Sequence, residues 1–103
     1  MISRVLQKKI KDSLSKITYE KIILFGSRSR NDYTKQSDID LLIVLKDNTS
    51  LNNKIYLSTQ VRKRLASEMI DADVLIKDKT DISYLKNKTG SVVHNALLDG
   101  IQL

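Results

Sequence analysis

The chain alternates between helix-like and strand-like patterns of apolar residues. Between residues 2 and 17, apolar side chains recur at spacings of four, four and three residues, while lysines occupy the other sides. This period is typical of an amphipathic helix with one buried face. The apolar positions of this stretch are Leu6, Ile10, Leu14 and Ile17. We therefore predict a first helix over residues 2–17.

Three short runs of mainly branched apolar residues predict buried strands. The first run, 21–25, is nearly all apolar and stops at Gly26. Such a run, without polar alternation, is typical of a strand that is buried on both faces. The second predicted strand covers residues 38–45, and the third covers residues 71–77. A polar segment, 27–37, separates the first strand from the second.

Further helices are predicted between and after these strands. A long helix is expected over 51–70, with Ser50 placed to cap its first turn. A short helical turn over 81–88 and a last helix over 91–99 follow, and Gly100 is expected to stop the last helix. The order of elements predicts an α/β fold with a short mixed β-sheet flanked by helices. We expect helices to cover one face of the sheet, with the site at the sheet's other end.

Composition narrows the class of protein without defining its chemistry. A chain of 103 residues is expected to form one domain, 1–103. The absence of cysteine excludes disulfides, thiolate metal sites and a cysteine nucleophile. The longest apolar run, 41–45, is far shorter than the roughly 20 residues of a membrane span, and no signal-peptide pattern is present, so we expect a cytoplasmic protein. The net charge of +6 permits attraction to nucleic acid, nucleotides or an acidic partner.

Paired carboxylates at the start of the second strand are the main candidates for chemistry. Side chains two residues apart on a strand project to the same face, so Asp38 and Asp40 are predicted to lie together. Neighbouring carboxylates repel unless a cation lies between them, and Mg²⁺ prefers such oxygen ligands. Asp73, near the start of the third strand, supplies a third carboxylate, and Asp71 competes with it for this role.

A candidate phosphate-binding turn precedes the carboxylates. Gly26 and Ser27 follow the first strand, where a glycine permits close approach of the backbone to a ligand. A helix that starts at Ser27 would direct free backbone N–H groups toward an anion. Arg28 and Arg30 add guanidinium groups, which suit phosphate oxygens. Together with the carboxylates, this segment could hold a nucleoside triphosphate through Mg²⁺.

These residues carry a family resemblance. Gly26-Ser27, the ten residues 28–37 and then Asp38-Ile39-Asp40 resemble the Gly-Ser, ten residues, Asp-x-Asp signature of the polymerase-β-like nucleotidyltransferases. More narrowly, the chain resembles the minimal nucleotidyltransferases of bacteria and archaea. The resemblance extends to the strand that begins near Asp73 and to the last predicted helix.

The resemblance implies a set of roles. By position, Asp38, Asp40 and Asp73 would be the metal-binding and catalytic carboxylates, with Asp73 also helping to activate the attacking hydroxyl. Gly26 and Ser27 would hold the outer phosphates of ATP or another triphosphate. Minimal nucleotidyltransferases are often paired with a HEPN-domain toxin, and some transfer AMP to a tyrosine of that toxin. The resemblance therefore implies an antitoxin that is a magnesium-dependent protein adenylyltransferase.

Two other function classes stay open at the level of sequence. A non-catalytic antitoxin could neutralise a toxin by binding alone, on the same fold. A basic RNA-binding module would rest only on the positive charge, and the chain offers few aromatic side chains for base stacking. An RNA acceptor is accordingly ranked below a protein acceptor.

Overall fold

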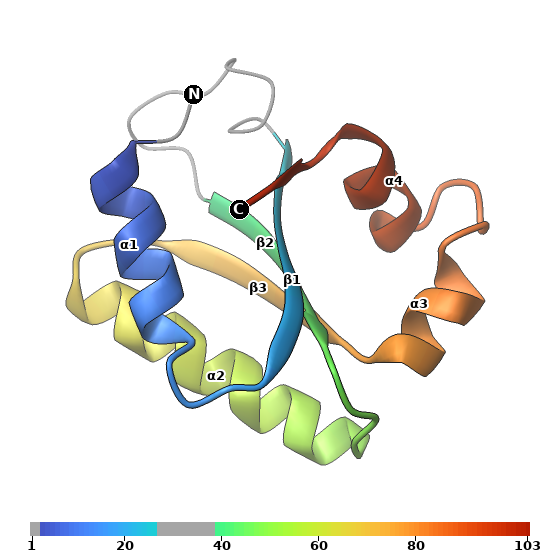
Figure 1. The fold of residues 1–103 in the computed structure, drawn as a ribbon, viewed down its shortest axis with the longest axis horizontal. Coiled ribbons are helices and arrows are strands. Elements are labelled where there is room, and N and C mark those ends of the chain that lie inside the picture. The colour runs from blue at the N-terminus through green and yellow to red at the C-terminus, as the bar shows by residue number, and fades with distance from the viewer. Residues whose placement is uncertain (1–2, 27–38) are drawn as a thin grey trace.

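A mixed four-stranded sheet forms the centre of the protein (Figure 1). The computed structural model describes residues 3–26 and 39–103. Its strands are β1 (Tyr19–Phe25), β2 (Ile39–Leu45), β3 (Ala72–Lys77) and β4 (Ile101–Gln102), in the order β3-β2-β1-β4. β1 pairs antiparallel with both β2 and β4, whereas β2 and β3 are parallel. The predicted mixed sheet is therefore confirmed.

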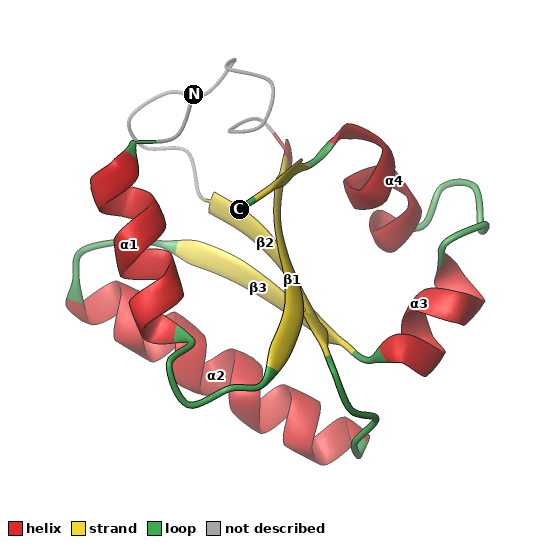
Figure 2. Ribbon diagram, in the orientation of Figure 1, coloured by secondary structure: helices red, strands yellow, loops and turns green. Residues whose placement is uncertain are grey.

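Four helices of the described residues flank this sheet (Figure 2). They are α1 (Arg4–Ser13), α2 (Leu51–Ser67), α3 (Lys79–Leu85) and α4 (Val92–Asp99). Ser50 caps α2 as predicted, because its side chain accepts a hydrogen bond from the backbone N–H of Asn53 at 3.1 Å. None of these helices has the length and apolar character that crossing a membrane requires.

Helices cover both faces of the sheet, so the expectation that they cover only one face was wrong. α1 and α2 pack on the face that carries Leu41 and Ile43, whereas α4 packs on the face that carries Leu42 and Val44. The physical reason lies in β2, whose side chains are apolar at every position from 41 to 45. A strand with apolar residues on both sides must be covered on both sides.

Several element boundaries differ from the predictions. The first helix ends at Ser13 rather than at residue 17, because Ser13 donates its hydroxyl to the carbonyl of Ile10 and the next backbone N–H groups form short turns. The long helix ends three residues early, before Met69, whose positive φ of 63° is incompatible with a continuing helix. The short helix begins at residue 79 rather than 81 and ends at 85.

The fourth strand was not predicted at all. After α4 stops at Gly100, Ile101 pairs with Leu24 and Gln102 pairs with Ile23 at the outer side of β1. A Cβ at Gly100 would crowd Ile23 and the carbonyl oxygen of Leu24, so the glycine permits this close approach of the chain to β1. A two-residue strand has no recognisable period in a sequence.

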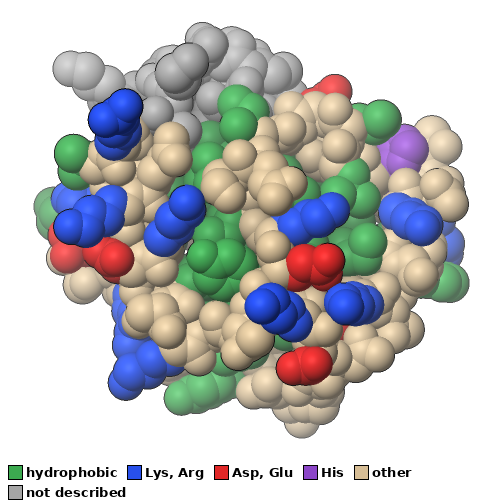
Figure 3. Space-filling model, in the orientation of Figure 1, with side chains coloured by type: hydrophobic (Ala, Val, Ile, Leu, Met, Phe, Trp, Pro, Cys, Tyr) green, Lys and Arg blue, Asp and Glu red, His purple; other side chains and the backbone are tan. Residues whose placement is uncertain are grey.

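Basic side chains are spread over the visible face of the molecule rather than gathered in one patch (Figure 3). Acidic side chains lie among them on that face, although the chain as a whole carries a net charge of +6. On this face, the basic side chains form no continuous stripe of the kind that nucleic-acid binding proteins present.

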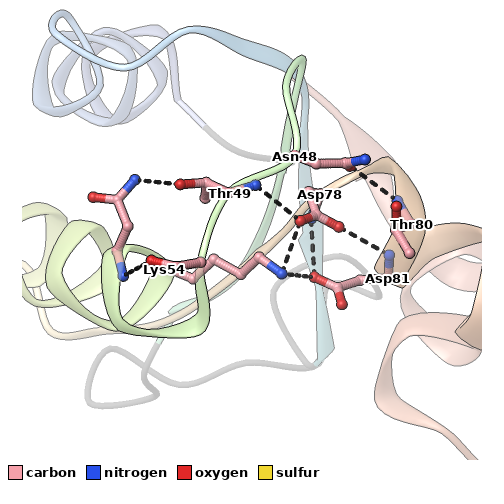
Figure 4. Close-up of polar contacts among 8 residues, drawn as sticks. Asn48, Thr49, Lys54, Asp78, Thr80 and Asp81 are labelled. Atoms are coloured by element: carbon pink, nitrogen blue, oxygen red, sulfur yellow. Dashed lines mark hydrogen bonds and ion pairs between the residues drawn. The ribbon is translucent and has the colours of Figure 1, made fainter.

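An ion-pair cluster joins α2 to α3 at the end of the sheet where β2 stops (Figure 4). The Nζ of Lys54 lies 2.8 Å from the carboxylate of Asp78 and 2.7 Å from that of Asp81. Asp78 is also the N-cap of α3, and its carboxylate and that of Asp81 exchange hydrogen bonds with each other's backbone N–H groups. The backbone N–H of Thr49 donates to Asp78 as well. The cluster therefore holds the loop before α2 against the start of α3.

The hydrogen bonds of this cluster determine the charge state of Asp78, which is only 3% exposed. Burial by itself would raise the pKa of Asp78, because the carboxylate loses water. Hydrogen bonds from Lys54 and from the backbone N–H groups of Asp81 and Thr49 outweigh burial, and the pKa of Asp78 falls well below its ordinary value. The hydrogen bonds that Lys54 itself makes, to Asp78 first and then to Asp81, raise the pKa of Lys54.

The lowered pKa of Asp78 predicts a loss of stability in acid. A carboxyl with a lower pKa in the folded state contributes stability above its unfolded pKa and loses it as the pH falls toward the folded pKa. We expect the free energy of unfolding, measured by urea denaturation, to fall as the pH drops below about 4. Asp78→Asn should show a smaller fall than the wild type and than the control Asp47→Asn, which removes an exposed carboxylate. Identical profiles for all three proteins would contradict this account.

Candidate functional site

Two of the three predicted carboxylates lie side by side on neighbouring strands. Asp40 of β2 is the register partner of Asp73 of β3 in the parallel pair. Paired residues of adjacent strands project to the same face, and the strands are about 4.8 Å apart. Asp40 is half-buried and Asp73 is exposed, so both carboxylates lie at the surface end of an otherwise apolar sheet.

Gly26, at the end of β1, completes this arrangement. It follows β1 directly after Phe25, which pairs with Asp40, and its φ is +75°. A Cβ placed on Gly26 would contact the carboxylate of Asp40 and would lie 3.3 Å from its Cγ. The nearest neighbour of that Cβ is the Asp40 side chain, and the predicted role of Gly26 in close approach to a ligand stays a prediction. The lack of a side chain at Gly26 therefore leaves room for the carboxylate of Asp40, a candidate catalytic residue.

The remaining predicted site residues fall outside the described residues. These are Ser27, Arg28, Arg30 and Asp38. Asp71, the alternative to Asp73, lies just before β3, where its backbone carbonyl accepts a hydrogen bond from the N–H of Ile39. That bond ties Asp71 into the start of the β2–β3 ladder, one residue before the strand that carries Asp73.

A hollow of about 440 Å³ lies against the two carboxylates. Its lining combines Asp40 and Asp73 with one arginine, Arg62, and with apolar side chains. The apolar members are Phe25, Val74, Leu75 and Val92. The hollow thus offers oxygen ligands, one cation and apolar walls, which suits a charged ligand that also has an apolar part.

The side chains at this site carry the type of ligand atom that magnesium prefers, which is carboxylate oxygen. The carboxylates of Asp40 and Asp73 are hard oxygen ligands, which Mg²⁺ takes alongside water and substrate phosphates. Within residues 3–26 and 39–103, no group of three His, Cys, Asp or Glu residues could hold a metal ion. The third predicted ligand, Asp38, is not among those residues.

Arg62 was missed by the sequence analysis. It lies within the run Arg62-Lys63-Arg64 of α2, and such a run is usually an exposed helix face. The neighbouring Val61 and Leu65 are fully buried. The helical period around these two residues places Arg62 at the border of the buried face, which was the signal that could have identified it.

Comparisons with known proteins identified a matching family and a similar relative. The model of a family described as nucleotidyltransferase domain matches residues 7–101. A protein of Methanocaldococcus jannaschii, provisionally named a protein adenylyltransferase, is 42% identical over 82 residues, which cover 76% of this chain and 83% of the relative.

Solved structures share the fold. A protein of Sulfolobus solfataricus, provisionally described as a nucleotidyltransferase, has a TM-score of 0.62 and 20% identity, covering 96% of this chain and 76% of that one. A toxin–antitoxin structure with AMP-PNP has a TM-score of 0.61 and 22% identity, covering 93% of this chain and 70% of that one. At identities this low, the two structures establish the fold alone.

The contact between Gly26 and Asp40 can be tested by substitution. Gly26→Ala should lower the free energy of unfolding by more than the roughly 1 kcal/mol of a left-handed alanine, because its Cβ also meets the Asp40 carboxylate. Gly90→Ala is the matched control, since Gly90 has a φ of +88° and nothing within 4 Å of a built Cβ. Denaturant titrations of both variants measure the difference.

A double-mutant cycle isolates the steric part of that effect. In an Asp40→Ala background, Gly26→Ala should cost no more than Gly90→Ala does, because the crowded carboxylate is gone. Equal losses for Gly26→Ala in the two backgrounds would show that Asp40 does not require the glycine.

Proposed function

The chain belongs to the nucleotidyltransferase domain family, and we propose that it transfers AMP from ATP to a hydroxyl group of a partner protein. The pairing of Asp40 with Asp73, next to a glycine that ends β1, carries this proposal. The relative that is provisionally named a protein adenylyltransferase supports the choice of AMP and of a protein acceptor. We propose that residues 1–103 act as one domain and that the protein works in the cytoplasm.

Three carboxylates would hold Mg²⁺ in this proposal: Asp38, Asp40 and Asp73. The bound ion would neutralise phosphate charge and favour departure of pyrophosphate. Asp40 and Asp73 supply the kind of oxygen ligand that magnesium prefers, and Gly26 leaves room for the Asp40 carboxylate.

The other residues of the site would position the nucleotide. Gly26 and Ser27 would bind the outer phosphates through backbone N–H groups and the serine hydroxyl, and Arg28 and Arg30 would add charge-assisted hydrogen bonds. Such contacts align the α-phosphorus for attack, which is the main contribution a protein can make to this kind of reaction.

Asp73 would act on the acceptor. Its carboxylate would take the proton of the acceptor hydroxyl while the hydroxyl oxygen forms a bond to the α-phosphorus. The bond between the α-phosphorus and the oxygen that bridges it to the β-phosphorus breaks, and pyrophosphate leaves with that oxygen. Asp73 suits this role because it is exposed and borders the hollow in which an acceptor could lie.

We propose that the acceptor is a HEPN-domain toxin and that the protein is its antitoxin. The likeness in fold to a toxin–antitoxin structure that contains AMP-PNP is consistent with this role. Modification of a toxin hydroxyl would explain why an antitoxin keeps paired carboxylates at the end of its sheet.

Transfer of label from ATP labelled at the α-phosphate tests the proposal. With Mg²⁺ and a host-cell extract, the wild-type protein should label a protein. Asp38→Asn and Asp73→Asn should each lower this transfer at least about 100-fold, because each removes a charge that the transition state needs. Asp71→Asn is the matched control and should stay within a few-fold of wild type. Thermal unfolding of each variant checks that the fold is intact.

The nature of the labelled product decides between the alternatives. Label on RNA would redirect the acceptor to a nucleic-acid hydroxyl. No Asp38-dependent label with any of the four nucleoside triphosphates would instead favour a non-catalytic antitoxin that acts by binding.

A further inference from the structure

β3 is an edge strand whose outer side has no strand partner among the described residues. The backbone N–H of Ile39 donates to the carbonyl of Asp71, and the register pairs Ile39 with Ala72. Because N–H and C=O groups alternate in direction along a strand, those of Ala72, Val74 and Ile76 point away from β2. β3 therefore presents a row of backbone donors and acceptors along a free edge.

Two adjoining hollows, together called the groove, lie along this edge, and one of them borders the carboxylates. The hollow against Asp73 and a second hollow of about 180 Å³ share Val74 and Leu75 in their linings. The second hollow is bordered by α2, where the side chains of Leu51 and Ile55 are 69% and 56% exposed. Exposed apolar side chains beside a free strand edge are typical of a binding surface.

We propose, on the basis of the function proposed above, that the acceptor hydroxyl is carried by an extended protein segment that pairs with the free edge of β3. The segment adds a strand to the sheet, with its backbone bonded to that of β3 and its apolar side chains against Leu51 and Ile55 of α2. Strand addition of this kind obtains affinity from main-chain hydrogen bonds and specificity from side-chain pockets. The acceptor is thus an extended stretch of polypeptide rather than a surface loop or a folded helix.

The geometry of a sheet brings the hydroxyl to the right place. A residue paired with Asp73 from an added strand projects its side chain to the same face, about 4.8 Å away across the sheet. A serine, threonine or tyrosine at that position would direct its hydroxyl toward the Asp73 carboxylate. The six residues of β3 offer about 20 Å of edge, enough to align the segment beyond the reacting residue.

The other edge of the sheet, formed by β4, would not bring an added strand next to Asp73. β4 lies beyond β1, and it pairs with Ile23 and Leu24, short of the end of β1 where Gly26 lies. Two strands, β1 and β2, separate β4 from β3 and Asp73. Among the strands that the structure describes, only β3 has a free edge next to the residue proposed to accept the proton.

A pair of neighbouring substitutions on α2 tests the groove. Ile55→Asp places a carboxylate against the proposed apolar contacts of the acceptor, where it would be poorly solvated. Tyr56→Asp is the matched control, because Tyr56 is 60% exposed but lines a different hollow, between α1 and α2. In the labelling assay with host-cell extract, Ile55→Asp should lower transfer to protein at least about tenfold. Tyr56→Asp should stay near wild type.

Nucleotide binding separates this inference from the proposed function. The affinity for a non-hydrolysable ATP analogue, measured by calorimetry, should be the same in Ile55→Asp and in wild type. Equal transfer by Ile55→Asp and wild type would overturn the inference while leaving the proposed function intact. A parallel loss of nucleotide affinity, or an equal loss in Tyr56→Asp, would also overturn it. Absence of transfer by the wild type would overturn both, and label on RNA would overturn the inference because RNA has no peptide backbone.

A second copy of this chain is the other extended occupant that the edge could accept. Size-exclusion chromatography of the wild type should give a monomer. A dimer that Ile55→Asp dissociates would overturn the proposal, since the edge of β3 would then be used for self-association.

Discussion

The burial of β2 on both faces is the constraint on which the rest of the structure depends. Leu41, Leu42 and Ile43 are completely buried. Leu41 and Ile43 lie on one face of the sheet, and Leu42 lies on the other. A central strand of this kind requires neighbours on both sides and helices above and below. Substitution of one such residue by alanine would typically cost about 2–5 kcal/mol, which is a large part of the roughly 5–15 kcal/mol that stabilises a small domain.

That constraint also explains where charge is tolerated. A carboxylate cannot occupy the buried middle of β2 without a partner, so it is found at the strand's beginning, at Asp40, which is half-buried. The parallel register then brings Asp73 beside it, and the antiparallel register brings the end of β1 and Gly26 to its other side. The candidate site is therefore a consequence of how three strands align at one end of the sheet.

Much of this arrangement could be predicted from the sequence because its signals are local. The nearly all-apolar runs identified β1 and β2, and Ser50 marked the start of α2. These inferences needed only the periods of strands and helices and the preferences of capping residues.

The features that the sequence did not reveal depend on contacts between distant segments. β4 has two residues and forms only because α4 returns the chain to β1, and Arg62 borders the site only because α2 packs beside β3. The sequence pattern assigned no role to Asp78, yet it is buried between α2 and α3 and paired with Lys54. Each of these roles is set by packing, which no single stretch of sequence contains.

The order of strands separates the two substrates in the proposed reaction. Gly26 at the end of β1 lies on one side of Asp40, and Asp73 on β3 lies on the other. A triphosphate bound beside Gly26 would therefore approach from the β1 side, and the acceptor would approach from the edge of β3. Because β2 lies between them, its carboxylate is the group that both substrates would share. The same strand pairing that stabilises the sheet would thus define a direction for the proposed transfer of AMP.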